Sequence, residues 1–376
     1  MMENKKIKVM HFVSGLLSGG VEEMLYNYCK YMDDDKYDFV IVYQHEPVAV
    51  CKEKLESIGC KTVRITARSD FFLKNIKDSI GIIKKEKPDI VHAHMNLMNF
   101  CALYAAKKSG VKVRISHSHI AEKNRGKVFR LISLLCRYLC MRYSTALFAC
   151  GEEAGEYLYG KKRMRVGLVE IVENAIDLES FSRNSEYRKD IRTKLNVMNK
   201  FVVGHVGRFT KQKNHERLID IFNQLLKYRK DAVLLLVGTG ELEGAIKKKT
   251  RDLLISDKVI FLGTTKNMNK IYNAMDIFVL PSLYEGFPVV SVEVQMTNLP
   301  SVFSDSIAPT CKITDAIQFV SLNNSDDEWA KAIIDVYNNF KLCDLTDIIK
   351  KYDIKRKVNE LDNYYSMSLR LEGCGE

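Results

Sequence analysis

The chain has 376 residues, of which 46% are hydrophobic and 28% are charged, and its formal net charge is +11. This length can bury two ordinary cores and exceeds the usual span of one doubly wound domain. The absence of low-complexity tracts excludes a disordered or fibrous protein, and three arginines interrupt the most apolar window, residues 128–150, which argues against a membrane-spanning helix.

The first half of the chain alternates short β-rich runs with longer segments of helical period. Such alternation predicts a parallel sheet with helices on both faces, because parallel strands need crossover connections. The predicted strands are residues 7–13, 37–43, 61–65, 88–94, 111–116, 145–150 and 167–172.

A second alternation follows a polar and irregular stretch at residues 174–199. Its predicted strands are residues 201–206, 232–237, 258–263, 276–281, 300–304 and 317–322. We therefore predict an α/β protein with two Rossmann-like doubly wound domains that face a cleft. The domains are expected at 1–178 and 179–354, and the C-terminal helix at 355–376 is expected to pack back on the first. Ligands of such sheets bind beyond the carboxyl ends of the strands.

The strongest chemical signal follows the predicted strand at 276–281. Glu285 lies in the loop, Pro288 suits the start of a helix, and Glu293 lies about 7.5 Å further along it. The free N–H groups and the dipole of a helix start favour a phosphate, and the two carboxylates could hold hydroxyl groups on either side of a diphosphate. The alternative is a helix-start carboxylate at Glu285 and a solvated charge at Glu293.

Two cations follow the first strand of the same domain. Arg208 comes directly after residues 201–206, and Lys213 lies five residues further on. Cations at this edge can neutralise a departing diphosphate, on which negative charge grows as a glycosidic bond to phosphate breaks.

Two other patterns are weaker. Gly238, Gly240 and Gly244 follow a strand as in a dinucleotide fingerprint, but no acidic ribose ligand follows about 20 residues later, so we interpret them as a tight strand-to-helix turn. Residues 33–35 are three aspartates that formally match a metal-binding pattern, and we interpret them as a solvated turn. No cysteine and histidine cluster of zinc-ligand spacing is visible, and we expect no metal.

The combination of motifs resembles glycosyltransferase family 4, which has the GT-B fold, and in particular its bacterial capsule and exopolysaccharide branch. The resemblance covers nearly the whole chain. It rests on the glycine-rich loop at 18–20, a histidine in the segment 116–119, Val206-Gly207-Arg208 with Lys213, and the element from Glu285 to Glu293. The last of these motifs is the most specific.

The resemblance implies roles in donor binding for the second domain. Arg208 and Lys213 would bind the diphosphate, Glu293 the nucleotide ribose, and Glu285 the donor sugar hydroxyls. The remaining predicted donor-binding residues belong to the same motifs: Gly19, Gly20, Gly286, Phe287 and Pro288.

The resemblance also implies catalytic residues, namely Glu285 at the donor sugar and a histidine of the first domain. His117 would lie over the sugar near the anomeric centre, and His119 is the second choice, because both follow the same strand. Gly19 and Gly20 would permit close backbone approach. The implied reaction is retaining and metal-independent, with no cofactor beyond the nucleotide-sugar substrate, and the first domain would bind the acceptor.

The implied partners are a nucleotide-sugar donor, UDP-hexose or UDP-N-acetylhexosamine, and a lipid-linked or oligosaccharide acceptor in cell-surface polysaccharide biosynthesis. Residues 107–142 carry ten Lys or Arg against one Glu, which suits an anionic membrane surface, and residues 127–143 fit either a helix on that surface or a core helix with arginines at its edge. No nucleic-acid motif accompanies the charge.

We read no signal peptide, and the scattered cysteines are typical of reduced thiols in the cytoplasm. The expected location is therefore cytoplasmic, with peripheral binding to the inner face of the membrane. Two alternatives stay open: a nucleotide-sugar epimerase of the same fold, and a non-catalytic basic binding protein.

Overall fold

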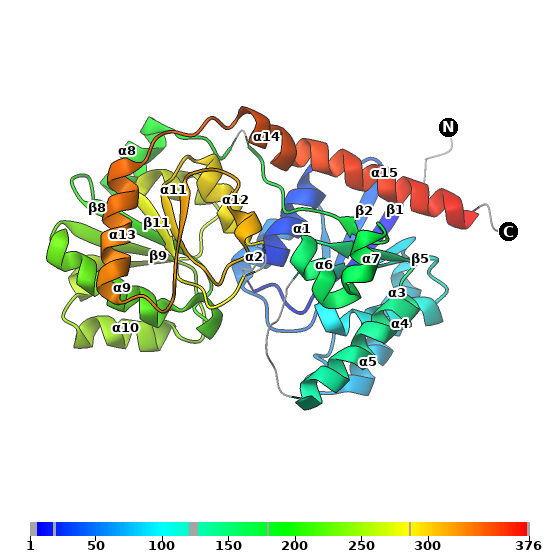
Figure 1. The fold of residues 1–376 in the computed structure, drawn as a ribbon. Coiled ribbons are helices and arrows are strands. Elements are labelled where there is room, and N and C mark those ends of the chain that lie inside the picture. The colour runs from blue at the N-terminus through cyan, green and yellow to red at the C-terminus, as the bar shows by residue number, and fades with distance from the viewer. Residues whose placement is uncertain (1–5, 18–19, 120–126, 179, 286, 374–376) are drawn as a thin grey trace. The chain divides into compact units, whose positions relative to one another are not determined.

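A computed structural model of the chain describes residues 6–17, 20–119, 127–178, 180–285 and 287–373. It divides into two compact units (Figure 1). Among the described residues, the first unit comprises 6–17, 21–119, 127–175 and 354–373, and the second comprises 20, 176–178, 180–285 and 287–353. Each unit contains one sheet whose paired strands all run parallel, which confirms the predicted pair of doubly wound folds.

The sheet of the first unit has seven strands in the order β3-β2-β1-β4-β5-β6-β7. Their bounds are β1 (Ile7–Phe12), β2 (Tyr37–Tyr43), β3 (Lys61–Arg64), β4 (Ile90–Ala93), β5 (Val113–Ser118), β6 (Ala146–Ala149) and β7 (Glu170–Ile171). Each lies within or next to a predicted β-rich run, because parallel strands that are buried on both faces leave short apolar runs rich in β-branched residues.

Helices cover both faces of this sheet. Val9 and Ile115 pack on one face with helices α1 and α15, whereas Met10 and Val91 pack on the other with α3 and α4. The helices of the unit are α1 (Gly20–Tyr31), α2 (Ala49–Glu56), α3 (Phe72–Glu86), α4 (Asn99–Lys108), α5 (Lys127–Tyr143), α6 (Glu152–Tyr159), α7 (Lys161–Arg165) and α15 (Ile354–Gly373).

The second unit has a six-stranded sheet in the order β10-β9-β8-β11-β12-β13. Its strands are β8 (Phe201–Val206), β9 (Ala232–Val237), β10 (Val259–Gly263), β11 (Ile277–Leu280), β12 (Ser301–Ser304) and β13 (Ile317–Val320). Its helices are α8 (Ser185–Lys194), α9 (His215–Tyr228), α10 (Glu243–Asp252), α11 (Met268–Ala274), α12 (Val289–Met296), α13 (Asp326–Asn339) and α14 (Thr346–Tyr352).

The expectation of an irregular segment at 174–199 was wrong in part, because α8 lies within it. Asn184 caps this helix by accepting hydrogen bonds from the backbone N–H groups of Glu186 and Tyr187, both at 2.9 Å. Arg192 of α8 is buried and pairs with Asp276 at 3.1 Å. The helix is held by charges as well as by apolar contacts, so its hydrophobic period is faint in the sequence.

Helix α5 exposes most of its apolar side chains. Leu131 and Leu135 are 72% and 59% exposed, and only a narrow stripe that includes Cys136 and Cys140 is buried. This burial pattern contradicts the alternative in which the leucines of residues 127–143 form a core. Within the described ranges, no helix is both long and apolar enough to cross a membrane.

Each sheet reverses its strand order at one point. The reversal lies between β1 and β4 in the first unit and between β8 and β11 in the second. Open α/β sheets bind ligands beyond the carboxyl ends of the strands at such a point. The loops that follow these four strands are therefore the expected places for a ligand.

Candidate functional site

In the second unit, hydrogen bonds tie the loop after β8 to the loop after β11. The backbone N–H of Leu283 donates to the carbonyl of Gln212 at 2.9 Å, and the side-chain amide of Gln212 donates to the carbonyl of Tyr284 at 2.9 Å. Asn214 donates from its side chain to the carbonyl of Pro281 at 3.1 Å. The predicted cations and carboxylate on these loops therefore share one edge of the sheet.

Lys213 and Glu285 form an ion pair at the centre of this edge. Lys213 Nζ lies 2.6 Å from Glu285 Oε1, and the two side chains are only 16% and 10% exposed. Gly207 lies beside the lysine stem, since a Cβ at that glycine would lie 3.0 Å from Lys213 Cδ. The two residues had been predicted to bind different parts of a donor, and their pairing was not foreseen.

Arg208 lies on the same loop and is half-buried. Among the described residues it has no ion-pair partner, so its charge is available to an anion. Two backbone hydrogen bonds join this loop to the segment after β9. The N–H of Phe209 donates to the carbonyl of Thr239 at 3.0 Å, and the N–H of Leu242 donates to the carbonyl of Phe209 at 3.1 Å.

Glycines permit this close approach of two loops. Gly238 has a φ of 134°, and a Cβ there would lie 2.2 Å from the carbonyl oxygen of Gly207. A Cβ at Gly240 would lie 2.6 Å from the carbonyl oxygen of Phe209. The glycines after β9 thus support the loop that carries Arg208.

Helix α12 begins at Val289, so Pro288 is its N-cap rather than its first residue. Pro288 accepts from the N–H of Ser291 at 2.9 Å. Glu293 is buried in the second turn, where the hydroxyl of Tyr272 donates to its Oε2 at 2.5 Å. The alternative of a solvated charge at Glu293 is therefore wrong.

The other predicted donor-binding residues are placed as follows. Phe287 is half-buried, and its ring stacks with that of Tyr352 at 5.9 Å between centroids. Gly20 is the first residue of α1. Gly19 and Gly286 lie outside the described residues.

In the first unit, both predicted histidines belong to a larger group. His117 lies in β5 and is fully buried, and His119 follows the strand and is half-buried. His11 of β1, His92 of β4 and His94 directly after β4 lie beside them, and all three are buried. We name these five residues the histidine array.

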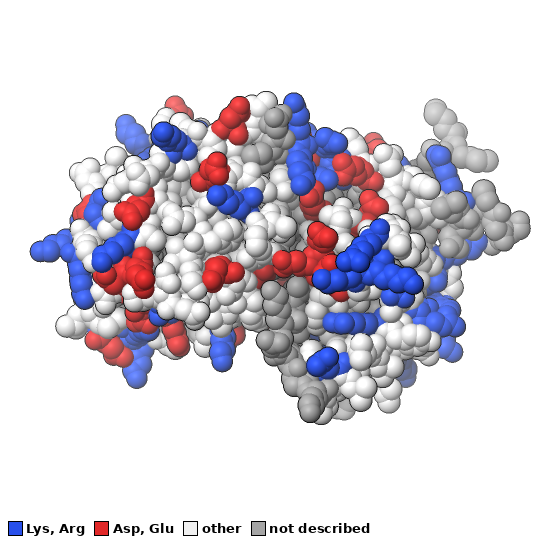
Figure 2. All heavy atoms as spheres, in the orientation of Figure 1, with Lys and Arg blue, Asp and Glu red and all other residues white. Residues whose placement is uncertain are grey.

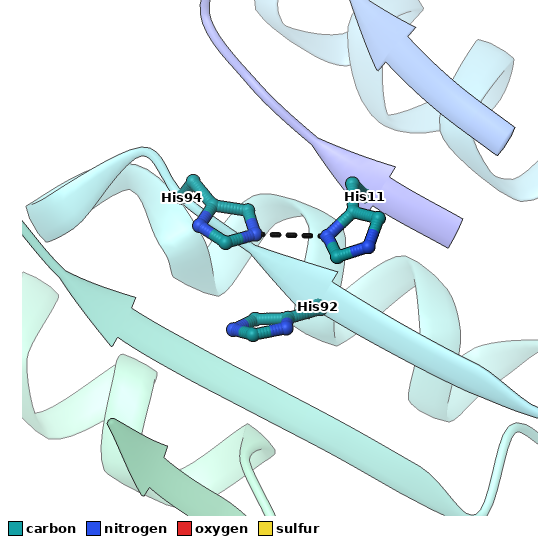
Figure 3. Close-up of side chains that lie close together, drawn as sticks. All are labelled: His11, His92 and His94. Atoms are coloured by element: carbon teal, nitrogen blue, oxygen red, sulfur yellow. Dashed lines mark hydrogen bonds between the residues drawn. The ribbon is translucent and has the colours of Figure 1, made fainter. Parts of the chain in front are cut away.

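The array consists of two hydrogen-bonded rows. In the outer row, His94 Nδ1 lies 2.9 Å from His119 Nε2. The other nitrogen of His94, Nε2, lies 3.0 Å from His11 Nδ1, and Figure 3 shows this second contact. In the inner row, His92 Nε2 lies 3.1 Å from His117 Nδ1, and His92 Nδ1 lies 2.8 Å from the hydroxyl of Tyr365.

Ring stacking joins the rows. The centroids of His92 and His94 are 4.2 Å apart, and those of His117 and His119 are 4.0 Å apart. Sequence reasoning missed this clustering because the histidines come from three strands. The signal was present, since His-Ala-His at 92–94 and His-Ser-His at 117–119 each place two rings on one face of adjacent strands.

Burial keeps the array neutral. It lowers the pKa of His11 and of His119 to about 3, and it lowers the pKa values of His92, His94 and His117 well below the ordinary value, with further lowering by neighbouring histidines. At neutral pH every ring therefore carries one N–H donor and one acceptor nitrogen.

Two groups of three rings bring ligand nitrogens within 4.8 Å of one another: His11 with His92 and His94, and His94 with His117 and His119. In each group two of these nitrogens already face each other in a hydrogen bond, His94 Nε2 with His11 Nδ1 in the first and His94 Nδ1 with His119 Nε2 in the second. The geometry thus favours hydrogen bonding over chelation, and the metal-free expectation stays a prediction.

Comparison with known proteins identifies the family. Residues 187–355 match the family described as glycosyl transferases group 1, and residues 18–180 match the family described as glycosyltransferase family 4. The first match spans the loops that carry Arg208, Lys213 and Glu285, and the second spans four of the five histidines, all except His11.

Similar proteins cover nearly the whole chain. The glycosyltransferase homologue EpsF of Bacillus subtilis (strain 168) is 33% identical, with 98% of each chain covered. A UDP-Gal:alpha-D-GlcNAc-diphosphoundecaprenol alpha-1,3-galactosyltransferase of Escherichia coli is 25% identical over 96% of this chain and 97% of that protein. The crystal structure of Anabaena HepE in complex with UDP-glucose is 17% identical, with a TM-score of 0.78 over 96% of this chain and 100% of that chain.

The extent of these matches shows more than a shared fold, and they confirm the resemblance on which the site was predicted. The chain belongs to glycosyltransferase family 4, as a GT-B enzyme among its bacterial polysaccharide glycosyltransferases.

Proposed function

We propose that this enzyme transfers a hexose or N-acetylhexosamine from a UDP-sugar to a lipid-linked or oligosaccharide acceptor in cell-surface polysaccharide biosynthesis, with retention of the anomeric configuration. The observation that carries the proposal is the charged edge of the second unit, where Arg208, the pair of Lys213 with Glu285 and the start of α12 follow β8 and β11.

The charge at this edge suits the leaving group. As the bond between sugar and diphosphate breaks, negative charge grows on the diphosphate, and a preorganised cation stabilises that charge without reorganisation. Arg208 has a free charge among the described residues, and Lys213 is held in place by Glu285. The start of α12 adds the positive end of a helix dipole, which favours an anion.

Glu293 and Glu285 are proposed to hold hydroxyl groups of the donor. Glu293 is fixed by the Tyr272 hydroxyl, so its carboxylate is oriented before the ribose arrives. Glu285 is fixed by Lys213 and would face the donor sugar. Preorganised acceptors of this kind lower the entropic cost of binding.

UDP as the donor nucleotide is supported by the structural neighbour solved with UDP-glucose and by the UDP-Gal donor in the name of the Escherichia coli relative. The lipid-linked acceptor is supported by the diphosphoundecaprenol in that name. The alpha linkage in the same name supports retention, because the sugar of a common UDP donor is also alpha-linked to its diphosphate. An alpha-linked product then keeps the configuration of the donor.

Of the two histidines, we propose that His119 contacts the sugar. His117 is fully buried, whereas His119 is half-buried, and its Nδ1 has no hydrogen-bond partner in the described part of the chain. A group that touches substrate must be reachable, so burial reverses the order of preference from the sequence.

Helix α5 is proposed to hold the enzyme at the cytoplasmic face of an anionic membrane. Its exposed leucines alternate with Arg130 and Arg142, the combination that binds an anionic lipid surface. Figure 2 shows lysine and arginine gathered over part of the first unit. Replacing Leu131 and Leu135 by Ser should reduce cosedimentation with vesicles that contain phosphatidylglycerol, and unchanged cosedimentation would remove α5 from the proposal.

The test of the reaction is a transfer assay with a panel of UDP-sugars and a synthetic lipid-diphosphate N-acetylhexosamine. We expect UDP release that requires the acceptor and a product whose anomeric proton coupling is that of an alpha linkage. Arg208→Gln should lower transfer at least about tenfold, since a hydrogen bond to a charged group contributes about 1.5–3 kcal/mol.

The matched control is Arg251→Gln at an exposed position of α10, which should leave transfer unchanged. A beta-linked product would contradict retention. An isomerised sugar formed from the donor alone would identify an epimerase, and equal transfer by the Arg208 variant would contradict the role of the charged edge.

A further inference from the structure

The outer row of the histidine array ends at the residue proposed to contact the sugar. His119 faces His94 through Nε2, and His94 faces His11 through its other nitrogen. His94 is thus the ring that connects both neighbours in the row. The nitrogen of His119 that carries the proton is therefore linked, through this hydrogen bond, to the tautomer of the buried His94.

Each contact in the row holds one proton. Because His94 is neutral, it donates through one nitrogen and accepts through the other. If His94 Nδ1 donates to His119 Nε2, the proton of His119 is on Nδ1, which is then a donor toward solvent. If His119 Nε2 donates to His94 Nδ1, then His94 Nε2 donates to His11, and His119 Nδ1 is an acceptor.

We propose that His94 is a positioning residue that determines which nitrogen of His119 carries the proton, and thereby whether His119 Nδ1 donates to a sugar hydroxyl or accepts from it. The inference rests on the proposed function of His119.

Both arrangements keep the row neutral. In each of them every ring carries one proton, and only the nitrogen that carries it differs. The arrangement that His94 favours therefore sets the role of His119 Nδ1 without placing a positive charge on the buried His11.

The surroundings fix the backbone independently of His94. The backbone N–H of His119 donates to Asn96 Oδ1 at 2.7 Å, and the side-chain amide of Asn99 donates to the carbonyl of His117 at 3.0 Å. Loss of the His94 ring should therefore change the state of the His119 ring more than its position.

The inner row supplies a matched control. His92 lies in β4, two residues before His94, and is likewise buried. It also forms two hydrogen bonds, but these are to His117 and Tyr365. A purely structural effect of an apolar replacement should be similar at the two positions. An effect on the protonation of His119 through the row should occur at His94 alone.

The experiment uses the full chain labelled with 15N-histidine, in the variants His94→Leu, His94→Gln and His92→Leu. We expect the ring-nitrogen shifts of His119, assigned by their loss in His119→Gln, to show a changed tautomer population in His94→Leu. His92→Leu should leave these shifts unchanged, and His94→Gln, which can both donate and accept, should restore them in part.

In the transfer assay, we expect His94→Leu to lower kcat at least about tenfold with little change in the KM of the donor. His92→Leu should lower kcat clearly less than His94→Leu does. Unchanged His119 shifts in His94→Leu, or equal losses of kcat in the two leucine variants, would overturn the positioning role of His94. The shifts are measured without substrate, so failure of the proposed reaction leaves them as an independent test.

Discussion

The carboxyl edges of the two sheets have the same topology and opposite chemistry. The edge of the second unit carries Arg208, the ion pair of Lys213 with Glu285, and the buried Glu293. The edge of the first unit carries five histidines that burial keeps neutral. A doubly wound sheet therefore fixes where a ligand is bound, whereas the residues after the strands decide whether it is bound by charge or by neutral hydrogen bonds.

The difference has a physical reason in each unit. A charged leaving group is best stabilised by fixed opposite charge. Neutral sugar hydroxyls both donate and accept, and a neutral imidazole can do the same with its two nitrogens. Positive charge shared among five adjacent rings would be strongly repulsive, so the array is stable only while it is neutral.

The largest expected effect comes from breaking the support of the charged edge. In Gly238→Ala, the new Cβ would lie 2.2 Å from the carbonyl oxygen of Gly207 at a φ of 134°. We expect a loss of stability of about 3 kcal/mol or more, together with a loss of UDP binding. Urea unfolding and calorimetry with UDP would measure both.

Gly244→Ala is the control for that variant. Gly244 lies in α10, where a Cβ would meet no described atom within 4 Å beyond its chain neighbours and its own helix backbone. Alanine is favoured over glycine in a helix by about 0.5–1 kcal/mol, so unchanged or higher stability is expected. Equal losses in the two variants would remove the argument that the glycines after β9 support Arg208.

The next effect comes from the ion pair itself. Lys213→Met leaves Glu285 without its partner at a nearly buried position, and such a loss costs about 3–5 kcal/mol. Adding Glu285→Gln should recover most of the stability, because both charges are then gone, but not the affinity for UDP. Recovery of UDP binding in the double variant would show that Lys213 does not bind the diphosphate.

Acid should distinguish the units. The folded pKa values of the array lie below the unfolded value of about 6.5, so the unfolded state binds more protons and stability falls as pH drops from about 6.5 toward 3. At pH 5.5 each such histidine lowers the free energy of unfolding by about 1.4 kcal/mol relative to its value well above pH 6.5. The second unit has two buried histidines of this kind, His205 and His215, against five in the first.

The single tryptophan, Trp329, is buried in the second unit and reports on its unfolding. At pH 5.5 we expect the helical circular dichroism signal to begin to decrease at a lower urea concentration than that at which Trp329 fluorescence changes. At pH 7.5 the urea concentrations of the two transitions should be closer together. Coincident transitions at both pH values would contradict the assignment of acid sensitivity to the array.

The smallest expected effect is that of a chelator. We expect the rate of transfer to be unchanged after treatment with EDTA, because ring nitrogens of the array already pair with one another in hydrogen bonds. A rate that falls with EDTA and returns with Zn²⁺ would instead assign metal binding to the array.

The strands were predictable because buried parallel strands leave short apolar runs in the sequence, as at residues 232–237. Arg208 and Lys213 were predictable because they follow a strand. The array and the pairing of Lys213 with Glu285 were not, since both depend on which strands are neighbours: β1, β4 and β5 in one sheet, and β8 with β11 in the other. Helix α8 was missed because Arg192 and Asp276 replace part of its apolar contact.

The central claim is that the charged edge of the second unit captures a diphosphate. Titration calorimetry of UDP and of uridine with the wild type and Arg208→Gln tests it most directly. We predict that the variant binds UDP at least about tenfold more weakly and that any affinity for uridine is the same in both proteins. Equal affinity of the two proteins for UDP would contradict the claim.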